Sequence, residues 1–144
     1  MFLVDTNVLI YAADEDAAAH QKCRSLLEGW RGQASPWYLT WSIVYEFLRV
    51  TTHPRVFRRP WSAREAWAFL AAVLASPAVE VLAETQRHES VLSDMLASIA
   101  GLSGNVFHDV HTAAIMAEHG ISVIYTRDRD FHRFRMLEVR DPLD

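Results

Sequence analysis

The fold of this protein is indicated by a short apolar run that ends in a carboxylate, Met1-Phe2-Leu3-Val4-Asp5-Thr6-Asn7. Apolar residues in succession, without alternation, predict a strand buried on both faces, as in the middle of a parallel sheet. Ligands of such sheets bind beyond the carboxyl ends of the strands, where Asp5 stands. Asp5 is also a good N-cap for the helix predicted to follow at Val8–Ala13, so this stretch alone leaves both interpretations open.

Strands and helices are predicted to alternate along the rest of the chain. Further apolar, strand-like runs occupy Ala34–Thr40, with Pro36 near its start as in an edge strand, Val79–Leu82, Ile121–Tyr125 and, as a last edge strand, Leu137–Val139. Helical periodicity predicts helices at Ala17–Trp30, at 41–50 with a Ser42 cap, at 62–75 with a Ser62 capping box, at Thr85–Ala100, and at Asn105–His119 with Gly120 as the C′ residue. This order predicts an α/β fold.

Composition limits the class of protein. The 144 residues are 51% hydrophobic and 22% charged, which predicts one globular domain over residues 1–144. Cys23 is the only cysteine, so neither an intramolecular disulfide nor a cysteine-based metal site can form. We expect a cytoplasmic protein, because no basic segment precedes the first apolar run and the longest apolar run, Ala66–Ala75, is too short to span a bilayer.

The cations of the chain are unevenly distributed. The net charge of −4 argues against a general basic nucleic-acid binder. Arginines outnumber the single lysine, Lys22, and guanidinium groups suit phosphate oxygens. Any affinity for nucleic-acid phosphates would therefore depend on local arginines, and the candidates are Arg49, Arg127, Arg129 and Arg133. Trp41 and Trp61 are possible base-stacking residues, although a core or interface role is the favoured interpretation.

Four carboxylates occupy similar places in this alternating pattern. Asp5 and Asp128 follow predicted strands, and Glu46 and Asp109 lie at the margins of apolar helix faces. Each has an ordinary explanation: a helix cap for Asp5, an exposed pair with Arg49 for Glu46, and a favourable charge in a first helical turn for Asp109. Together they predict a cluster that requires a cation or protons to neutralise it.

A site made only of carboxylates favours hard divalent ions such as Mg²⁺ or Mn²⁺. Such ions activate water and stabilise a phosphoryl group, so the predicted chemistry is phosphodiester hydrolysis. His108, His111 and His132 neighbour the acids and are candidates for substrate contact or proton transfer, but their spacing matches no standard metal motif. Nucleotide-binding and serine-hydrolase motifs are absent from the sequence.

These residues, in this order, resemble the PIN domain, and more closely the VapC-type toxins of type II toxin–antitoxin modules. The resemblance rests on Asp5-Thr6-Asn7 after an apolar strand, on Glu46 in Tyr45-Glu46-Phe47-Leu48-Arg49, on Asp109-Val110-His111-Thr112-Ala113-Ala114, and on Thr126-Arg127-Asp128-Arg129-Asp130-Phe131. It covers nearly the whole chain. Val110 replaces the alanine that is more usual after the third acid, which leaves the carboxylates in place.

The resemblance implies a three-layer α/β/α sandwich with a central, mainly parallel sheet. It implies a Mg²⁺- or Mn²⁺-dependent endoribonuclease acting on single-stranded or loop RNA, which forms homodimers and is inhibited by a cognate antitoxin. The implied catalytic and metal-binding residues are Asp5, Glu46, Asp109 and Asp128. Hydrogen-bonding support is implied for Thr6, Asn7 and Thr126, and Asp130 is implied as a supporting or alternative ligand.

Two other functions are consistent with the sequence. One is a PIN-type nuclease in RNA processing or at DNA ends, which the small size and lack of added domains disfavour. The other is a catalytically inactive protein-binding module, in which the acids are caps and surface charges. This second hypothesis predicts no tighter metal binding than at ordinary surface carboxylates.

Overall fold

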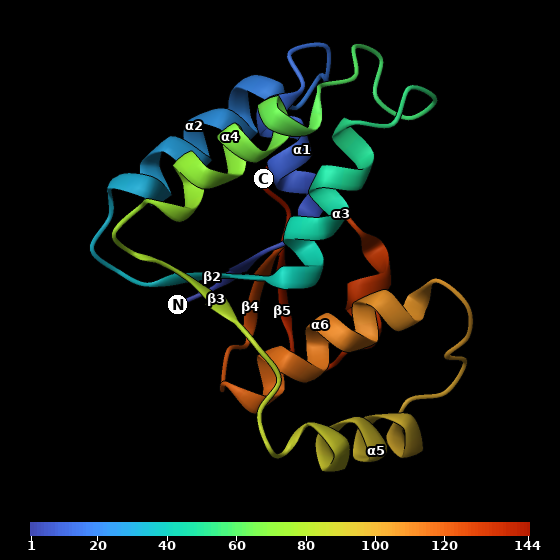
Figure 1. Cartoon of the computed structure of the whole chain (residues 1–144). Coiled ribbons are helices and arrows are strands. Elements are labelled where there is room, and N and C mark those ends of the chain that lie inside the picture. Colours follow the sequence, from blue (N-terminus) through green and yellow to red (C-terminus); the bar gives the residue numbers. More distant parts are fainter.

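The apolar run at the start of the chain forms β1 (Leu3–Val4), the central strand of a five-stranded parallel sheet (Figure 1). The computed structural model describes residues 1–144. The strand order is β3-β2-β1-β4-β5, and every neighbouring pair is parallel. The remaining strands are β2 (Trp37–Thr40), β3 (Val79–Leu82), β4 (Val123–Tyr125) and β5 (Glu138–Arg140). The predicted central parallel sheet is therefore confirmed.

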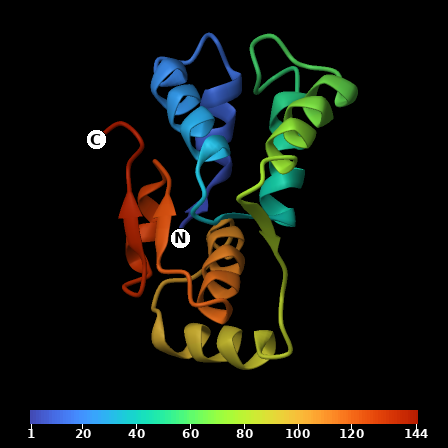
Figure 2. The same ribbon diagram turned by 90° about the vertical axis from the view of Figure 1, so that its left-hand side faces the viewer.

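Helices cover both faces of this sheet. The six α-helices are α1 (Thr6–Ala13), α2 (His20–Gly32), α3 (Trp41–Thr51), α4 (Ala63–Leu74), α5 (His88–Ser98) and α6 (Val106–Glu118), and a short 3₁₀ helix, η1 (Arg129–Arg133), follows β4. Figures 1 and 2 show α1 to α4 on one side of the sheet and α5 and α6 on the other. The predicted three-layer α/β/α sandwich is confirmed.

The direction of chain progress explains the two layers. From β1 to β2 to β3 the chain moves stepwise toward one edge of the sheet, and from β3 it returns past β1 to β4 and β5. Crossovers between parallel strands are right-handed, so reversing the direction of progress places the connecting helices on the opposite face. The reversal makes the space between β1 and β4 a topological switch point, the usual ligand site of open α/β sheets.

Some sequence predictions about local structure were wrong. The second strand is not an edge strand, because β2 lies between β1 and β3, and Pro36 precedes the strand and so removes no hydrogen bond from it. The cap of α3 is Thr40, whose hydroxyl accepts a hydrogen bond from the Ile43 amide at 3.3 Å, whereas Ser42 already lies in the first turn. Element type was correctly predicted in both places, but the end of each element depended on tertiary pairing.

Two predicted helix ends are confirmed. The Ser62 side chain accepts a hydrogen bond from the Glu65 amide at the start of α4. Gly120, just after α6, has φ +68°, a left-handed conformation that other residues rarely adopt. No helix combines the length and the apolar character needed to cross a membrane.

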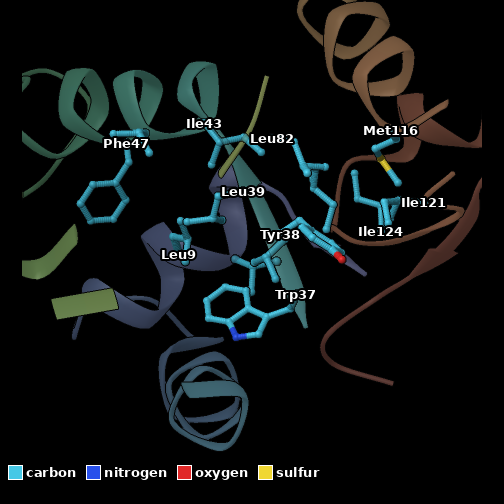
Figure 3. Packing of buried hydrophobic residues seen from close by; sticks show 14 of the residues in the cluster. Leu9, Trp37, Tyr38, Leu39, Ile43, Phe47, Leu82, Met116, Ile121 and Ile124 are labelled. Carbon is cyan, nitrogen blue, oxygen red and sulfur yellow. The ribbon is translucent and has the colours of Figure 1, made fainter. Parts of the chain in front are cut away.

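One hydrophobic core extends from Leu3 to Phe134 and includes residues of both helical layers. Figure 3 shows Leu9 and Phe47 packed on one side of β2, and Met116 and Ile124 toward the other. Phe47 is fully buried and stacks on Phe69 at a ring-centroid distance of 5.1 Å. Since Phe47 directly follows Glu46, its packing fixes the part of α3 that carries this carboxylate.

We expect Phe47→Ala to lower the free energy of unfolding by about 3–5 kcal/mol, because it leaves a cavity where a whole ring was buried. Urea denaturation followed by circular dichroism measures the change. The control is Val56→Ala, at a side chain that is 58% exposed, which should change stability by less than about 0.5 kcal/mol. Equal effects of the two variants would contradict the core position of Phe47.

Candidate functional site

Asp5 lies at the switch point, directly after β1. Parallel pairing of β1 with β4 aligns Leu3 with Ile124, and the Asp5 amide donates to the Tyr125 carbonyl at 3.0 Å. The Asp5 side chain also caps α1, since its Oδ1 accepts a hydrogen bond from the Thr6 amide at 2.8 Å. Both interpretations of Asp5 therefore hold, because one carboxylate caps the helix and faces the ligand end of the sheet.

The second oxygen of Asp5 is held by side chains from two distant segments. Oδ2 accepts hydrogen bonds from Thr126 Oγ1 and from Asn7 Nδ2, both at 2.7 Å. Thr126 Oγ1 in turn accepts from Asn7 Nδ2 at 2.9 Å and from the Asp128 amide at 2.9 Å. Asn7 Oδ1 accepts from the Arg127 amide at 3.1 Å. This network fixes the Asp5 carboxylate and ties the turn after β4 to the turn after β1.

Glu46 is brought to the same place by α3. Thr6 Oγ1 donates to Glu46 Oε2 at 2.9 Å, which links the first turn of α1 to α3. The alternative partner, Arg49, approaches Glu46 Oε1 at 3.7 Å, so the predicted surface pair also exists, as a long and exposed contact. Each oxygen of Glu46 thus has a different neighbour, and the shorter contact is the one inside the site.

Three further carboxylates come from α6 and from the segment after β4. Asp109 lies in the first turn of α6, and Asp128 caps η1 by accepting a hydrogen bond from the Asp130 amide at 2.9 Å. Carboxylate oxygens of Asp109, Asp128 and Asp130 lie within 4.8 Å of one another. Oxygen atoms at this spacing suit a hard divalent cation.

All of these carboxylates line one open pocket of about 1020 Å³. Its walls come from the start of α1, from α3, from the turn before α6 with the first turns of that helix, and from the segment after β4. Thr6 and Asn7 also line it, whereas the buried Thr126 acts on it through Asp5. The four acids named from the sequence, together with Asp130, therefore face a common space.

The pKa of Asp5 reflects its burial. Burial raises the pKa of Asp5 to about 6, above its usual 3.8. Hydrogen bonds from Thr126 and Thr6 act in the opposite direction, and the nearby charges of Glu46 and Asp128 raise the pKa further. The charged form of Asp5 is therefore poorly solvated.

The pKa of Asp109 is raised for the same reasons. Partial burial and the charges of Asp128, Asp5, Asp130 and Glu46, in that order of effect, raise the pKa of Asp109 to about 7. A bound cation would relieve both desolvation and repulsion, and so lower these pKa values. The donor set and its electrostatics fit a divalent metal.

The four candidate RNA-binding arginines lie differently with respect to the pocket. Arg49 lines it, whereas Arg127 contacts Asp141 at 3.4 Å, and Arg133 contacts Asp130 at 3.0 Å. Arg129 is exposed at the start of η1. Only Arg49 is therefore at the pocket itself, and the other three lie toward its β4 side.

The histidines are also separated by the structure. His108 lines the pocket, whereas His111, one turn further along α6, hydrogen-bonds Glu84 outside it. His132 is exposed on η1 and does not line the pocket.

The sequence reasoning missed other residues of the pocket wall, namely Ser42, Tyr45, Ser103 and Asn105. Tyr45 could have been found from its position next to Glu46 on the polar side of α3. Ser103 and Asn105 gave no such signal, because they lie in the turn that leads into α6 and only the fold brings this turn to the pocket.

Comparison with known proteins identifies the family to which this chain is similar. Residues 2–136 match the model of the PIN domain family. The chain is 40% identical to ribonuclease VapC43 of Mycobacterium tuberculosis over 144 residues, covering 100% of this chain and 97% of that protein. It is 30% identical to ribonuclease VapC48 of the same organism over 138 residues, covering 96% and 94% of the two chains.

Solved structures share the fold. VapBC2 from Rickettsia felis, bound to a DNA fragment from its promoter, aligns with a TM-score of 0.70 at 13% identity, covering 96% of each chain. VapC20 of Mycobacterium tuberculosis, a sarcin–ricin loop cleaving toxin, aligns with a TM-score of 0.69 at 23% identity, covering 98% of this chain and 100% of that one.

The raised pKa values predict how stability depends on pH without metal. With folded-state values near 6 and 7 and an unfolded value near 3.8, the folded protein binds more protons than the unfolded chain between about pH 4 and 7. This contribution to the free energy of unfolding therefore falls as pH rises through that window. In EDTA, the Tm of the wild type should fall relative to that of Asp109→Asn as pH rises from about 5 to about 7.

Mg²⁺ should raise the Tm of the wild type at about pH 8 far more than at about pH 5, because protons compete with the ion for the carboxylates. Asp94→Asn, at an exposed position of α5, is the matched control and should behave as the wild type at both pH values. Two results would count against a metal site at these carboxylates. One is an equal rise in Tm with Mg²⁺ at both pH values, and the other is an equal rise in Tm with Mg²⁺ in Asp109→Asn and in the wild type.

Proposed function

The chain belongs to the PIN domain family and, within it, to the VapC group, and on this premise we propose that it is a Mg²⁺- or Mn²⁺-dependent endoribonuclease. The observation that carries the proposal is the convergence of Asp5, Glu46, Asp109 and Asp128 on one open pocket. We assign the catalytic and metal-binding roles to these four residues. Two of them have pKa values raised toward neutrality, as expected where a cation is the missing neutralising charge.

The carboxylates would hold the ion from two sides of the pocket. Asp109 and Asp128 supply oxygens from α6 and from the segment after β4, and Asp130 lies close enough to be a further or alternative ligand. Asp5 approaches from the N-cap position of α1, and Glu46 approaches from α3. When bound, such an ion supplies an activated water and neutralises charge on the phosphoryl oxygens of the substrate.

The supporting residues act before substrate arrives. Thr126 and Asn7 donate hydrogen bonds to Oδ2 of Asp5, and Thr6 donates one to Oε2 of Glu46. These carboxylates are therefore already oriented and do not have to reorganise when a metal ion and the substrate bind. In the reaction, a water oxygen forms a bond to phosphorus, the bond to one bridging ribose oxygen breaks, and protons leave with that oxygen and with solvent. The open pocket gives a polynucleotide chain room to enter and leave.

We further propose that the protein is the toxin of a type II toxin–antitoxin module, inhibited by a cognate antitoxin. Its full-length similarity to VapC ribonucleases supports this role.

Residues 1–144 would act as one domain, because a single core joins Leu3 to Phe134. The cytoplasm would be its compartment, where Cys23 stays reduced. The homodimer implied by the family resemblance stays a prediction, to be tested by light scattering.

Replacing Asp5 should abolish catalysis. We expect Asp5→Asn to reduce cleavage of a mixed RNA pool at least about 100-fold. Loss of a residue that only orients a metal ligand costs about 10- to 100-fold, and loss of the metal ligand itself should cost more. The assay compares Mg²⁺, Mn²⁺ and EDTA. Asp94→Asn should cut as the wild type does. Identical products from the wild type and Asp5→Asn with every ion would contradict the assignment, and would favour a protein-binding module.

RNA binding should depend on the arginines near the pocket. We propose Arg49, Arg127, Arg129 and Arg133 as phosphate contacts, with Arg49 nearest to the carboxylates. Arg49→Ala should reduce the slope of log affinity against log salt by about 0.7, the value for one phosphate contact on a single strand. Arg24→Ala, on the exposed side of α2, is the control and should leave the slope unchanged. Unchanged binding after replacement of all four arginines would exclude this assignment.

A further inference from the structure

We propose that the exposed side of α3 is a stacking platform for unpaired RNA bases beside the cleaved phosphate, with Tyr45 as its central residue and Trp41 and Arg49 on either side. The inference rests on the proposed ribonuclease function and deepens it. It assigns a part of the substrate, the bases next to the scissile bond, to side chains outside the carboxylate cluster.

The platform follows from helical spacing. Trp41, Tyr45 and Arg49 are separated by four residues each, so they lie one turn apart, about 6 Å along the helix axis, on the same side of α3. The opposite side of the helix carries Ile43 and Phe47 and is buried in the core. α3 is therefore held rigidly through one face while it presents two aromatic rings and a guanidinium on the other.

The exposure of these rings has no structural explanation within the chain. Tyr45 is 70% exposed and Trp41 is 49% exposed, although both rings are large and largely apolar. By contrast, Trp61 packs against Phe47 and Phe69, which confirms the favoured core interpretation for that tryptophan. Exposed aromatic side chains that share one helix face are typical of binding surfaces.

The position of Tyr45 connects this face to the carboxylates. Tyr45 and Arg49 line the pocket that holds the acids, and both also line a second hollow of about 500 Å³. Leu48, Ala63 and Trp67 form much of the rest of this hollow, between α3 and α4. A chain that leaves the carboxylates along α3 toward this hollow therefore passes Tyr45 and Arg49.

Electrostatics favour nucleobases as the occupant of the platform. The chain has a net charge of −4 and the pocket is acidic, so attraction to phosphates alone cannot provide strong RNA binding. Stacking on aromatic rings contributes without regard to charge and requires unpaired bases. Arg49, whose only ion pair is the long contact to Glu46, has its guanidinium available for a phosphate between stacked bases.

The test measures binding without cleavage. In EDTA, fluorescence anisotropy gives the affinity of each variant for a labelled oligouridylate of about 12 nucleotides and for the matching ribose-phosphate chain without bases. We expect Tyr45→Ala to weaken oligouridylate binding about 10-fold, in line with stacking of one base, and to leave binding of the base-free chain unchanged. Tyr45→Phe, which keeps the ring, should bind as the wild type, and Trp41→Ala should also lose affinity.

Leu96→Ala, an exposed apolar position on α5, is the control for loss of surface, and circular dichroism checks that each variant is folded. Equal affinity of Tyr45→Ala and the wild type for oligouridylate, or equal losses on the two ligands, would overturn the platform. The first result would assign the face to a protein partner. If the wild type cuts RNA and Tyr45→Ala binds RNA as the wild type does, only the platform is contradicted. If binding depends on the bases and on Tyr45 but the wild type does not cut RNA, only the nuclease function is contradicted.

Discussion

The parallel pairing of β1 with β4 is the constraint on which the rest of the site depends. It aligns the residues that follow the two strands, so that Asp5 and Thr126 come within hydrogen-bonding distance although they are 121 positions apart. The chain leaves these two strands toward opposite helical layers, which opens the sheet edge between them. A loss of this register would separate the turn carrying Asp128 from the helix that begins after Asp5.

The site concentrates negative charge that the protein itself does not neutralise. Asp5 and Asp109 have raised pKa values because burial and neighbouring carboxylates both disfavour their charged forms. The fold tolerates this arrangement because a core of buried apolar residues, including Leu9 and Phe47, packs on the helices that carry the acids. Stability is thus provided away from the pocket, and the pocket is left with negative charge suited to a cation.

The surroundings of the carboxylates divide into two kinds of surface. On the β4 side, Arg133 is paired with Asp130, and Arg127 with Asp141, so these guanidinium groups have partners in the chain itself. On the α3 side, Tyr45 and Arg49 extend the pocket toward an apolar hollow. This asymmetry suggests that the two directions away from the scissile bond serve different parts of a bound polynucleotide.

The sequence by itself determined the class of fold and the identities of the main acids. Hydrophobic periodicity is a local property, so strands such as β1 and helices such as α6 could be recognised, and strand-end or first-turn acids such as Asp5 and Asp109 could be singled out. The order of the strands in the sheet could not be predicted, because lateral pairing involves residues far apart in the chain. For this reason the strand after Pro36 was wrongly placed at an edge.

Only the tertiary structure decided which groups share the pocket. It brought Asp130 beside Asp109 and Asp128, turned His111 away toward Glu84, and exposed Tyr45 beside the acids. It also chose Thr40 over Ser42 as the cap of α3, since the end of β2 fixes where that helix can start. The physical reason is common to these cases: sequence patterns report which face of an element is buried, whereas proximity between exposed side chains depends on how separate elements pack.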